Sequence, residues 1–173
     1  MPTNFEFKAR CNDLSAAESI LLLHQPLFIG VDNQTDTYFH VNQGRMKLRE
    51  GNIENALIHY QRIDSASAKQ SSVLLYQHKP DACLKQILTT ALGIKTIVRK
   101  KRKIYFINNV KFHFDQVDGL GTFIEVEAID IDGSADVEEL RKQCNYYAQL
   151  FGLAETDYMG GSYSDMLLEK NPH

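Results

Sequence analysis

Charged side chains alternate with apolar ones in several short segments of the chain. Glu125 and Glu127 share one face of such a segment, and residues 45–49 carry three cations on one face. A period of two is typical of β-strands. Carboxylates suit hard divalent cations such as Mg²⁺ or Mn²⁺, whereas Lys and Arg suit phosphate groups. Residues of these types, brought together, would bind a polyphosphate with its metal ion.

These polar strand faces have two possible directions. The ordinary one is outward to water, with the apolar faces on a core. The other is inward, in a barrel with a polar interior and helices packed on its apolar exterior. Carboxylates and cations gather on different strands, whereas solvent-facing strands usually mix both signs with Ser, Thr and Gln. This segregation favours the barrel.

The elements that must position these residues are mostly strands. Clear alternation predicts strands over residues 4–10, 45–49, 111–115 and 123–128, with weaker candidates at 57–62, 72–78 and 96–106. Turn residues at 118–121 predict a hairpin. Three helices are expected: one after a capping box at Ser15–Glu18, one from Asp81 to Gly93, and one from Ser134 to Gly152. The pattern predicts an α+β fold.

Size and composition restrict what the protein can be. Its 173 residues fit a single domain over residues 1–173, and its net charge of −3 disfavours a general binder of nucleic acid or anionic membranes. No apolar run is long enough to span a membrane. Three distant cysteines, Cys11, Cys83 and Cys144, indicate no disulfide framework. We therefore expect a cytoplasmic protein without nucleic-acid or membrane partners.

Six segments, in order along nearly the whole chain, resemble motifs of the CYTH superfamily, the triphosphate tunnel metalloenzymes. Asn4–Lys8 resembles the ExExK motif, Gln34–Phe39 the Q-x-D-x-Y-F segment, Lys47–Arg49 a basic strand, Val98–Arg102 the K-x-R strand, Asp115–Glu127 the D-x-V-x-G-L-G-x-F-x-E-x-E block, and Ser162–Leu168 the closing S-Y-S-D-L-L. This resemblance implies an eight-stranded antiparallel β tunnel, a closed barrel with a polar interior, with flanking α-helices.

Within the superfamily, Tyr60–Arg62 and His113–Asp115 are most similar to class IV adenylyl cyclases. The resemblance implies divalent-metal-dependent conversion of ATP to cyclic AMP and pyrophosphate, with Mg²⁺ or Mn²⁺ as the cofactor. Other members hydrolyse inorganic, nucleoside or thiamine triphosphate, so a triphosphatase is the first alternative. Relatives form homodimers, and a homodimer is therefore possible here, although the sequence indicates no interface.

The resemblance also assigns roles to individual residues. The carboxylates expected to bind metal and support catalysis are Glu6, Glu125, Glu127 and, as a fourth, Asp115. The cations expected to bind the triphosphate are Lys8, Lys47, Arg49, Arg62, Lys100 and Arg102. His113 is either a further substrate contact or a packed strand residue.

Asn4 departs from the family pattern, because it occupies the position of the first Glu in ExExK. An Asn side chain offers a carbonyl oxygen to a hard cation but no negative charge. A weaker metal site would follow. The second alternative is therefore a non-catalytic sensor that binds a nucleotide or polyphosphate without turning it over.

Overall fold

The computed structural model describes residues 4–62 and 69–171. The strands are β1 (Asn4–Arg10), β2 (Leu27–Phe39), β3 (Arg45–Glu50), β4 (Ala56–Arg62), β5 (Lys69–Gln77), β6 (Ile94–Ile107), β7 (Val110–Val117) and β8 (Gly121–Ile129). The helices are α1 (Leu14–Leu22), α2 (Ala82–Leu92), α3 (Val137–Leu150) and α4 (Tyr163–Lys170), with a 3₁₀ turn, η1, at Glu155–Asp157. The α+β prediction is confirmed.

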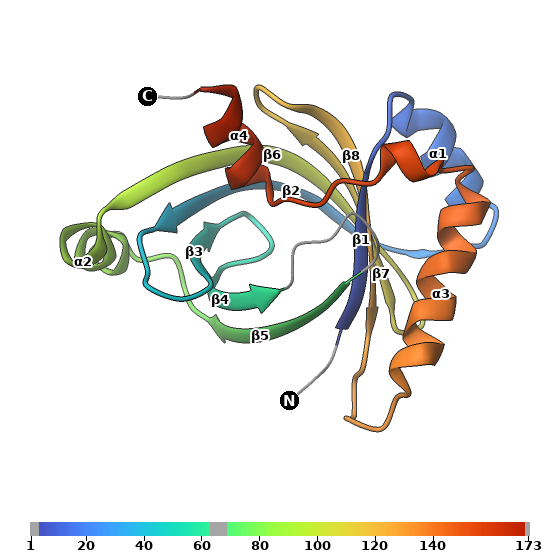
Figure 1. The fold of residues 1–173 in the computed structure, drawn as a ribbon, viewed down its shortest axis with the longest axis horizontal. Helices are drawn as coiled ribbons and strands as arrows, with labels where there is room; N and C mark the ends of the chain where they lie inside the picture. Colours follow the sequence, from blue (N-terminus) through green and yellow to red (C-terminus); the bar gives the residue numbers. More distant parts are fainter. Residues whose placement is uncertain (1–3, 63–68, 172–173) are drawn as a thin grey trace.

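The eight strands form one strongly curled antiparallel sheet that closes on itself in the order β1-β5-β4-β3-β2-β6-β7-β8 (Figure 1). The join between β1 and β5 is the shortest, with three residue pairs from Asn4–Ser71 to Glu6–Lys69 among the described residues. The predicted hairpin is confirmed, since β7 and β8 pair along their length up to Val117–Gly121. The closed order directs one face of every strand toward a common interior.

The main hydrophobic core lies outside this barrel. The apolar faces of β1, β7 and β8 pack under α1 and α3, which lie side by side along that wall in Figure 1. Phe112, Ile124 and Val126 are fully buried there, against Leu140 and Cys144 of α3. Alternation along the strands thus leaves their polar faces inside the barrel, as predicted.

A second, smaller cluster lies at one end of the interior. There Tyr163 of α4 packs on Val98, Val117 and Phe123, which come from β6, β7 and β8. Figure 1 shows α4 lying across β6 at this end of the barrel. The sequence did not lead us to expect this helix, which begins at a capping box formed by Ser162 and Asp165.

Two of the predicted helix starts are wrong. Asp13 caps α1 by accepting from Ala16 N, and Asp136 caps α3 by accepting from Glu138 N, in place of the predicted Ser15 and Ser134. Carboxylates are at least as good as hydroxyls at this position, and each Asp directly precedes the first helical residue, whereas Ser15 lies within α1 and Ser134 lies two residues before the cap of α3. The predicted Asp81 cap of α2 is confirmed, with Gly93 at its end.

Candidate functional site

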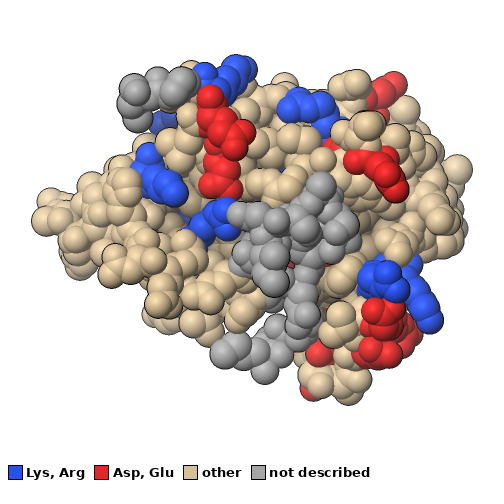
Figure 2. Space-filling model, in the orientation of Figure 1, with Lys and Arg blue, Asp and Glu red and all other residues tan. Residues whose placement is uncertain are grey.

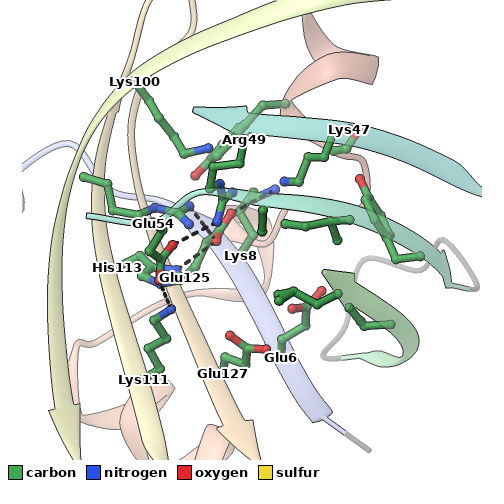
Figure 3. Close-up of a pocket in the computed structure, with 18 of the residues that line it drawn as sticks. Glu6, Lys8, Lys47, Arg49, Glu54, Lys100, Lys111, His113, Glu125 and Glu127 are labelled. Carbon is green, nitrogen blue, oxygen red and sulfur yellow. Dashed lines mark hydrogen bonds and ion pairs between the residues drawn. The ribbon is translucent and has the colours of Figure 1, made fainter. Parts of the chain in front are cut away.

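Most of the predicted site residues line one cavity of about 500 Å³ inside the barrel. The predicted residues that line it are Glu6, Lys8, Lys47, Arg49, Lys100, Arg102, His113, Glu125 and Glu127. They come from β1, β3, β6, β7 and β8, so only barrel closure brings them together. In Figure 3, Lys47, Arg49 and Lys100 lie on one side of the cavity, and Glu6 and Glu127 lie on the other.

Asp36 of β2 organises the cations on the first side. Its buried carboxylate accepts from Lys47 at 3.0 Å, from Arg49 Nε at 2.9 Å and from Lys100 Nζ at 2.9 Å. Burial alone would raise the pKa of Asp36, but Arg49 and Lys100 hold it well below its usual value. Burial, opposed by Asp36 and reinforced by Arg102, lowers the pKa of Lys100 to about 7. One carboxylate therefore holds three cations whose combined charge it does not balance.

Asp115 binds Arg102 without itself lining the cavity. The guanidinium of Arg102 donates to both carboxylate oxygens, at 2.7 Å and 2.5 Å, and Tyr163 Oη donates to one of them at 2.7 Å. The other contact of Arg102 is with Glu125 at 2.9 Å. Despite burial, Arg102 lowers the pKa of Asp115. Asp115 thus lies beneath the cavity wall, and its expected role as a metal ligand stays a prediction.

Glu125 lies between two cations and a histidine, which come from three strands. Its carboxylate is 3.2 Å from Lys8 Nζ and 2.9 Å from Arg102, and it contacts His113 Nδ1 at 3.2 Å. Burial and the positive charge of Arg102 lower the pKa of His113 to about 4, so the imidazole is neutral at pH 7. With Nδ1 facing Glu125, Nε2 of this buried ring has no hydrogen-bond partner.

Glu6 and Glu127 form a carboxylate pair near the other end of the cavity. They are directly paired across β1 and β8, and burial together with the charge of Glu6 raises the pKa of Glu127 to about 7. Asn4 Nδ2 donates to Glu127 at 2.6 Å, while the buried Asn4 Oδ1 has no partner. Two carboxylates beside an unsatisfied amide oxygen fit a hard divalent cation, with phosphate or water completing the shell. In the described part of the chain, no three acidic, His or Cys side chains converge closely enough to hold a metal by themselves.

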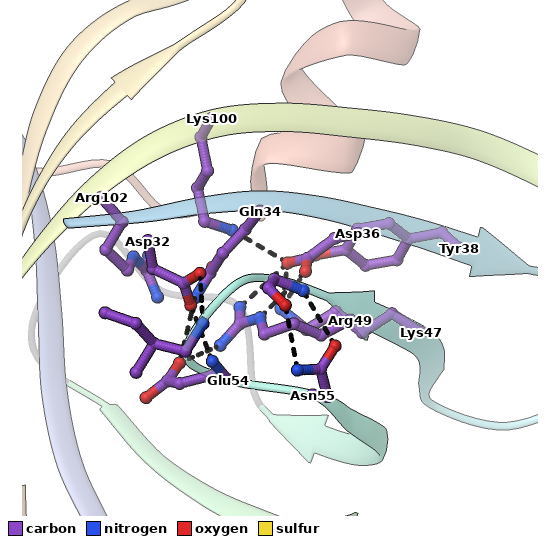
Figure 4. A network of polar contacts seen from close by, with 12 residues as sticks. Asp32, Gln34, Asp36, Tyr38, Lys47, Arg49, Glu54, Asn55, Lys100 and Arg102 are labelled. Carbon is purple, nitrogen blue, oxygen red and sulfur yellow. Dashed lines mark hydrogen bonds and ion pairs between the residues drawn. The ribbon is translucent and has the colours of Figure 1, made fainter. Parts of the chain in front are cut away.

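A loop between β3 and β4 adds a charged residue that the sequence analysis missed. Glu54 accepts from Arg49 at 3.0 Å and from Lys111, a further cation in the cavity wall. Despite burial, these two cations lower the pKa of Glu54. Asp32 fixes the loop by accepting from the backbone of Ile53 and Glu54 at 3.0 Å and 2.9 Å (Figure 4). Glu54 thus presents its carboxylate to the same cations that a phosphate would need.

Glycine is required where this loop begins. A Cβ atom at Gly51 would lie 2.5 Å from Asp32 Oδ1 and 2.8 Å from the carbonyl oxygen of Glu54. The backbone must therefore approach Asp32 closely for the loop to be held. Glu54 lies outside a strand, so no alternating pattern in the sequence identifies it. Lys111 shares the polar face of β7 with His113, and its place in the cavity wall could have been inferred.

The polar interior of the barrel also carries an apolar stretch. The face that β4 and β5 turn to the cavity carries Ala56, Ile58, Tyr60, Val73 and Leu75, with Gln77 at the end of β5. Arg62, predicted to bind phosphate, continues this face at the end of β4, but its side chain lies outside the described residues.

The exterior shows no comparable gathering of cations on the face seen in Figure 2, where Lys and Arg are interspersed with Asp and Glu in small groups. Within residues 4–62 and 69–171, no helix is long and apolar enough to cross a membrane. The cations that line the cavity are gathered there together with carboxylates, in a molecule whose net charge is −3.

The sequence matches the CYTH domain family over residues 3–163. The chain therefore belongs to the CYTH family, whose members are typically triphosphate-processing enzymes that depend on a divalent metal ion. A comparison with curated proteins finds no match.

Several solved structures share the fold. The PH1012 protein of Pyrococcus horikoshii is 23% identical with a TM-score of 0.80, the alignment covering 94% of this chain and 98% of that one. A proposed adenylate cyclase from Vibrio parahaemolyticus is 20% identical with a TM-score of 0.72, covering 95% and 97%. HpAC1 from Hippeastrum, a proposed adenylyl cyclase described as having a dominant triphosphatase activity, is 12% identical with a TM-score of 0.63, covering 98% and 95%.

Proposed function

We propose that this protein is a divalent-metal-dependent enzyme that processes a triphosphate inside its barrel, and that it converts ATP to cyclic AMP and pyrophosphate. One observation carries the proposal: the cations Lys8, Lys47, Arg49, Lys100, Arg102 and Lys111 line one cavity that also holds the Glu6–Glu127 pair. Phosphoryl-transfer enzymes act mainly by positioning and by neutralising charge, so such a cavity suits the chemistry.

The free protein already holds its cations in a phosphate-binding arrangement. Asp36 contacts Arg49 and Lys100, Glu54 contacts Arg49, and Glu125 contacts Lys8, at distances of 2.9–3.2 Å. An incoming phosphate would share or replace these contacts. Arg49 and Arg102 would donate through their planar forks, and the lysines would act as point charges.

A metal ion, Mg²⁺ or Mn²⁺, would be held by Glu6 and Glu127 with the unpartnered Asn4 Oδ1, and would supply charge neutralisation to the phosphate oxygens. In the cyclase reaction, the ribose 3′-oxygen forms a bond to the α-phosphorus, its proton passes to solvent, and the bond from that phosphorus to the oxygen bridging to the β-phosphate breaks. Pyrophosphate leaves with that oxygen. The cations would hold the β- and γ-phosphates in place during this exchange.

Hydrolysis of the triphosphate is the second candidate, favoured by the description of HpAC1, which shares the fold. The same cavity would then place water in line with the terminal phosphorus. The water oxygen would bond to that phosphorus, giving up a proton to solvent, while the bond to the bridging oxygen breaks, so that the diphosphate leaves and orthophosphate is the other product. A sensor that binds without turnover is the third, since Asn4 contributes no charge to the carboxylate pair. We further propose that the protein acts in the cytoplasm on a small-molecule triphosphate.

A product assay separates these candidates. Purified protein is incubated with ATP, and separately with inorganic triphosphate, each with Mg²⁺ or Mn²⁺. Cyclic AMP and pyrophosphate would identify a cyclase, orthophosphate without cyclic AMP a hydrolase, and tight binding without product a sensor. If the protein neither turns over nor binds either ligand, the assignment of the cavity as a triphosphate site is contradicted.

Matched variants on one strand tie the product to the cavity. Lys100→Met should lower the rate about 100-fold, because it removes a preorganised cation. Lys101→Met, whose side chain is exposed on the opposite face of β6, should leave the rate unchanged.

A further inference from the structure

His113 lies at the middle of the inner face of β7, in the wall of the cavity. Its neighbour on that face in one direction is Lys111, which is paired with Glu127 across β7 and β8. Its neighbour in the other direction is Asp115, which binds Arg102. The imidazole is therefore placed between a carboxylate proposed to hold the metal ion and a cation proposed to bind phosphate.

Glu125 fixes which nitrogen of this imidazole carries the proton. Nδ1 of His113 lies 3.2 Å from the Glu125 carboxylate, beside which the ring is drawn in Figure 3. Although burial would raise the pKa of Glu125, Arg102 and Lys8 hold it well below its usual value, so the group is ionised and can only accept. Nδ1 must therefore donate, and Nε2 of the neutral ring is left as an acceptor.

This acceptor has no partner within residues 4–62 and 69–171. The side chain of His113 is 5% exposed and lines the cavity. Buried polar atoms are nearly always paired, so an unpaired one in a cavity wall indicates a ligand group that pairs with it. An ionised phosphate presents only acceptor oxygens and cannot pair with a second acceptor. The matching group is an O–H donor, which is a hydroxyl group or a water molecule.

Both candidate reactions use an O–H group as the attacking nucleophile: the ribose 3′-hydroxyl in the cyclase reaction and water in hydrolysis. We propose that Nε2 of His113 accepts a hydrogen bond from this attacking group and orients its oxygen toward the phosphorus. This inference rests on the proposed function and deepens it, because the cations hold the phosphates whereas His113 holds the nucleophile. His113 keeps its own proton on Nδ1 throughout, and the proton of the attacking group passes to solvent, as in the two reactions above.

Two amide substitutions separate the two ring nitrogens. His113→Asn places an amide near the position of Nδ1, where it can donate to Glu125, and leaves no atom at the position of Nε2. His113→Gln extends its amide to the position of Nε2, where the oxygen can accept. With ATP and Mg²⁺, kcat should fall about 100-fold in His113→Asn, because misplacing a reacting group by ~1 Å costs about that much, and only about tenfold in His113→Gln.

Binding is measured beside the rate. Surface plasmon resonance with inorganic triphosphate and Mg²⁺ should give both variants a Kd within about twofold of that of the unaltered protein, which also shows that they are folded. His113→Phe replaces His113→Asn if the latter does not fold. Gln116→Asn, at an exposed position on the opposite face of β7, should change neither quantity.

Where cyclic AMP is the product, 3′-deoxy-ATP adds a test by binding alone. The unaltered protein should bind ATP about 3- to 10-fold more tightly than 3′-deoxy-ATP, the effect of one hydrogen bond, and His113→Asn should bind the two alike. A preference for ATP that persists in His113→Asn would overturn the inference, because the hydroxyl would then be held by another group.

Equal losses of rate in His113→Asn and His113→Gln would also overturn it, as would losses of triphosphate binding that match the losses of rate, because His113 would then be a phosphate contact or a part of the wall. Product formation by the unaltered protein would leave the proposed function intact in these cases. If the unaltered protein forms no product, the proposed enzymatic function fails, and the inference with it.

Discussion

Single carboxylates in this barrel each bind two or three cations and hold them close together. Asp36 contacts Lys47, Arg49 and Lys100, and Glu54 contacts Arg49 and Lys111. Cations packed this closely repel one another, so the carboxylates lower the cost of assembling them before a ligand arrives. The lining cations remain within reach of a polyanion, and burial lowers the pKa of Lys100, which lies among them, to about 7.

Lys100 is expected to take up a proton when a triphosphate binds. Its pKa of about 7 leaves it mostly neutral at pH 8, and the negative charge of phosphate would raise that pKa. Titration calorimetry at pH 8, in buffers of different ionisation enthalpy, should show uptake approaching one proton per ligand. Lys100→Met should abolish this uptake, and heats that do not depend on the buffer would contradict the prediction.

Asn4 is expected to limit metal affinity. Asn4→Glu would add a charged oxygen beside Glu6 and Glu127, so half-maximal activity should require about tenfold less Mg²⁺, an effect of ~1.4 kcal/mol. Asn4→Gln, which keeps the amide, should not have this effect. An unchanged Mg²⁺ dependence in Asn4→Glu would mean that the missing carboxylate is not limiting.

At the scale of the elements, helix starts depend on residues close to the first turn. Asp136 accepts from Glu138 N at 3.1 Å and caps α3, whereas Ser134 Oγ donates to Asp132. Asp136→Ala should therefore lower the free energy of unfolding by about 1 kcal/mol. Ser134→Ala, measured beside it by urea denaturation, should cost clearly less, and the reverse order would restore the assignment of Ser134 as the cap.

The contacts between β2 and the β3–β4 loop explain why Glu54 reaches the cavity. Asp32 on β2 accepts two backbone N–H groups of the β3–β4 loop, and Gln34 donates to both Asp32 and Glu54, at 2.7 Å and 3.1 Å. A strand on one side of the barrel thereby fixes a loop that joins two others. The loop is consequently part of the rigid wall of the site.

In the molecule as a whole, the inner face of the curled sheet carries most of the buried charge, and the main apolar core lies on its outer face. The core under α1 and α3 covers the outer face of β1, β7 and β8, and the interior of those strands is charged. Stability should therefore depend on the protonation of buried interior carboxylates as well as on the outer core.

Acid is expected to destabilise the protein through Asp36. Its folded-state pKa lies well below the ~3.9 of an unfolded Asp, so the unfolded chain binds more protons between the two values. The stabilisation is thus present above about pH 4 and is lost as the pH falls through the folded-state pKa.

Asp36→Asn should lower the free energy of unfolding by about 3–5 kcal/mol at pH 7, because it leaves three cations without their carboxylate, and by about 1 kcal/mol less near pH 3, where the unfolded chain has begun to take up the proton. Urea denaturation at both pH values measures this difference. Asp118→Asn, on the exposed turn between β7 and β8, is the control, and an equal loss from Asp36→Asn at both pH values would contradict the linkage.

Local chain geometry was enough to identify the strands that alternate and the residues that share a face. Period-two alternation depends only on local chain geometry, so β1, β3, β7 and β8, and with them Glu6, Lys47 and Glu127, were found without the structure. The CYTH motifs further predicted the closed sheet. The 13-residue β2 was missed as a strand because Leu27, Phe28 and Ile29 at its start do not alternate with polar residues.

Which charges meet, and where the apolar stretch of the cavity wall lies, depends on how distant strands pair. Asp36 is 64 residues from Lys100 along the chain, and Asp115 is 48 residues from Tyr163, so their contacts depend on register across distant strands. Val73 and Leu75 are as apolar as any core residue, and nothing local shows that they face a cavity. Which face of a strand is buried, and against what, is settled by the elements packed around it, because burial is a property of the assembled chain.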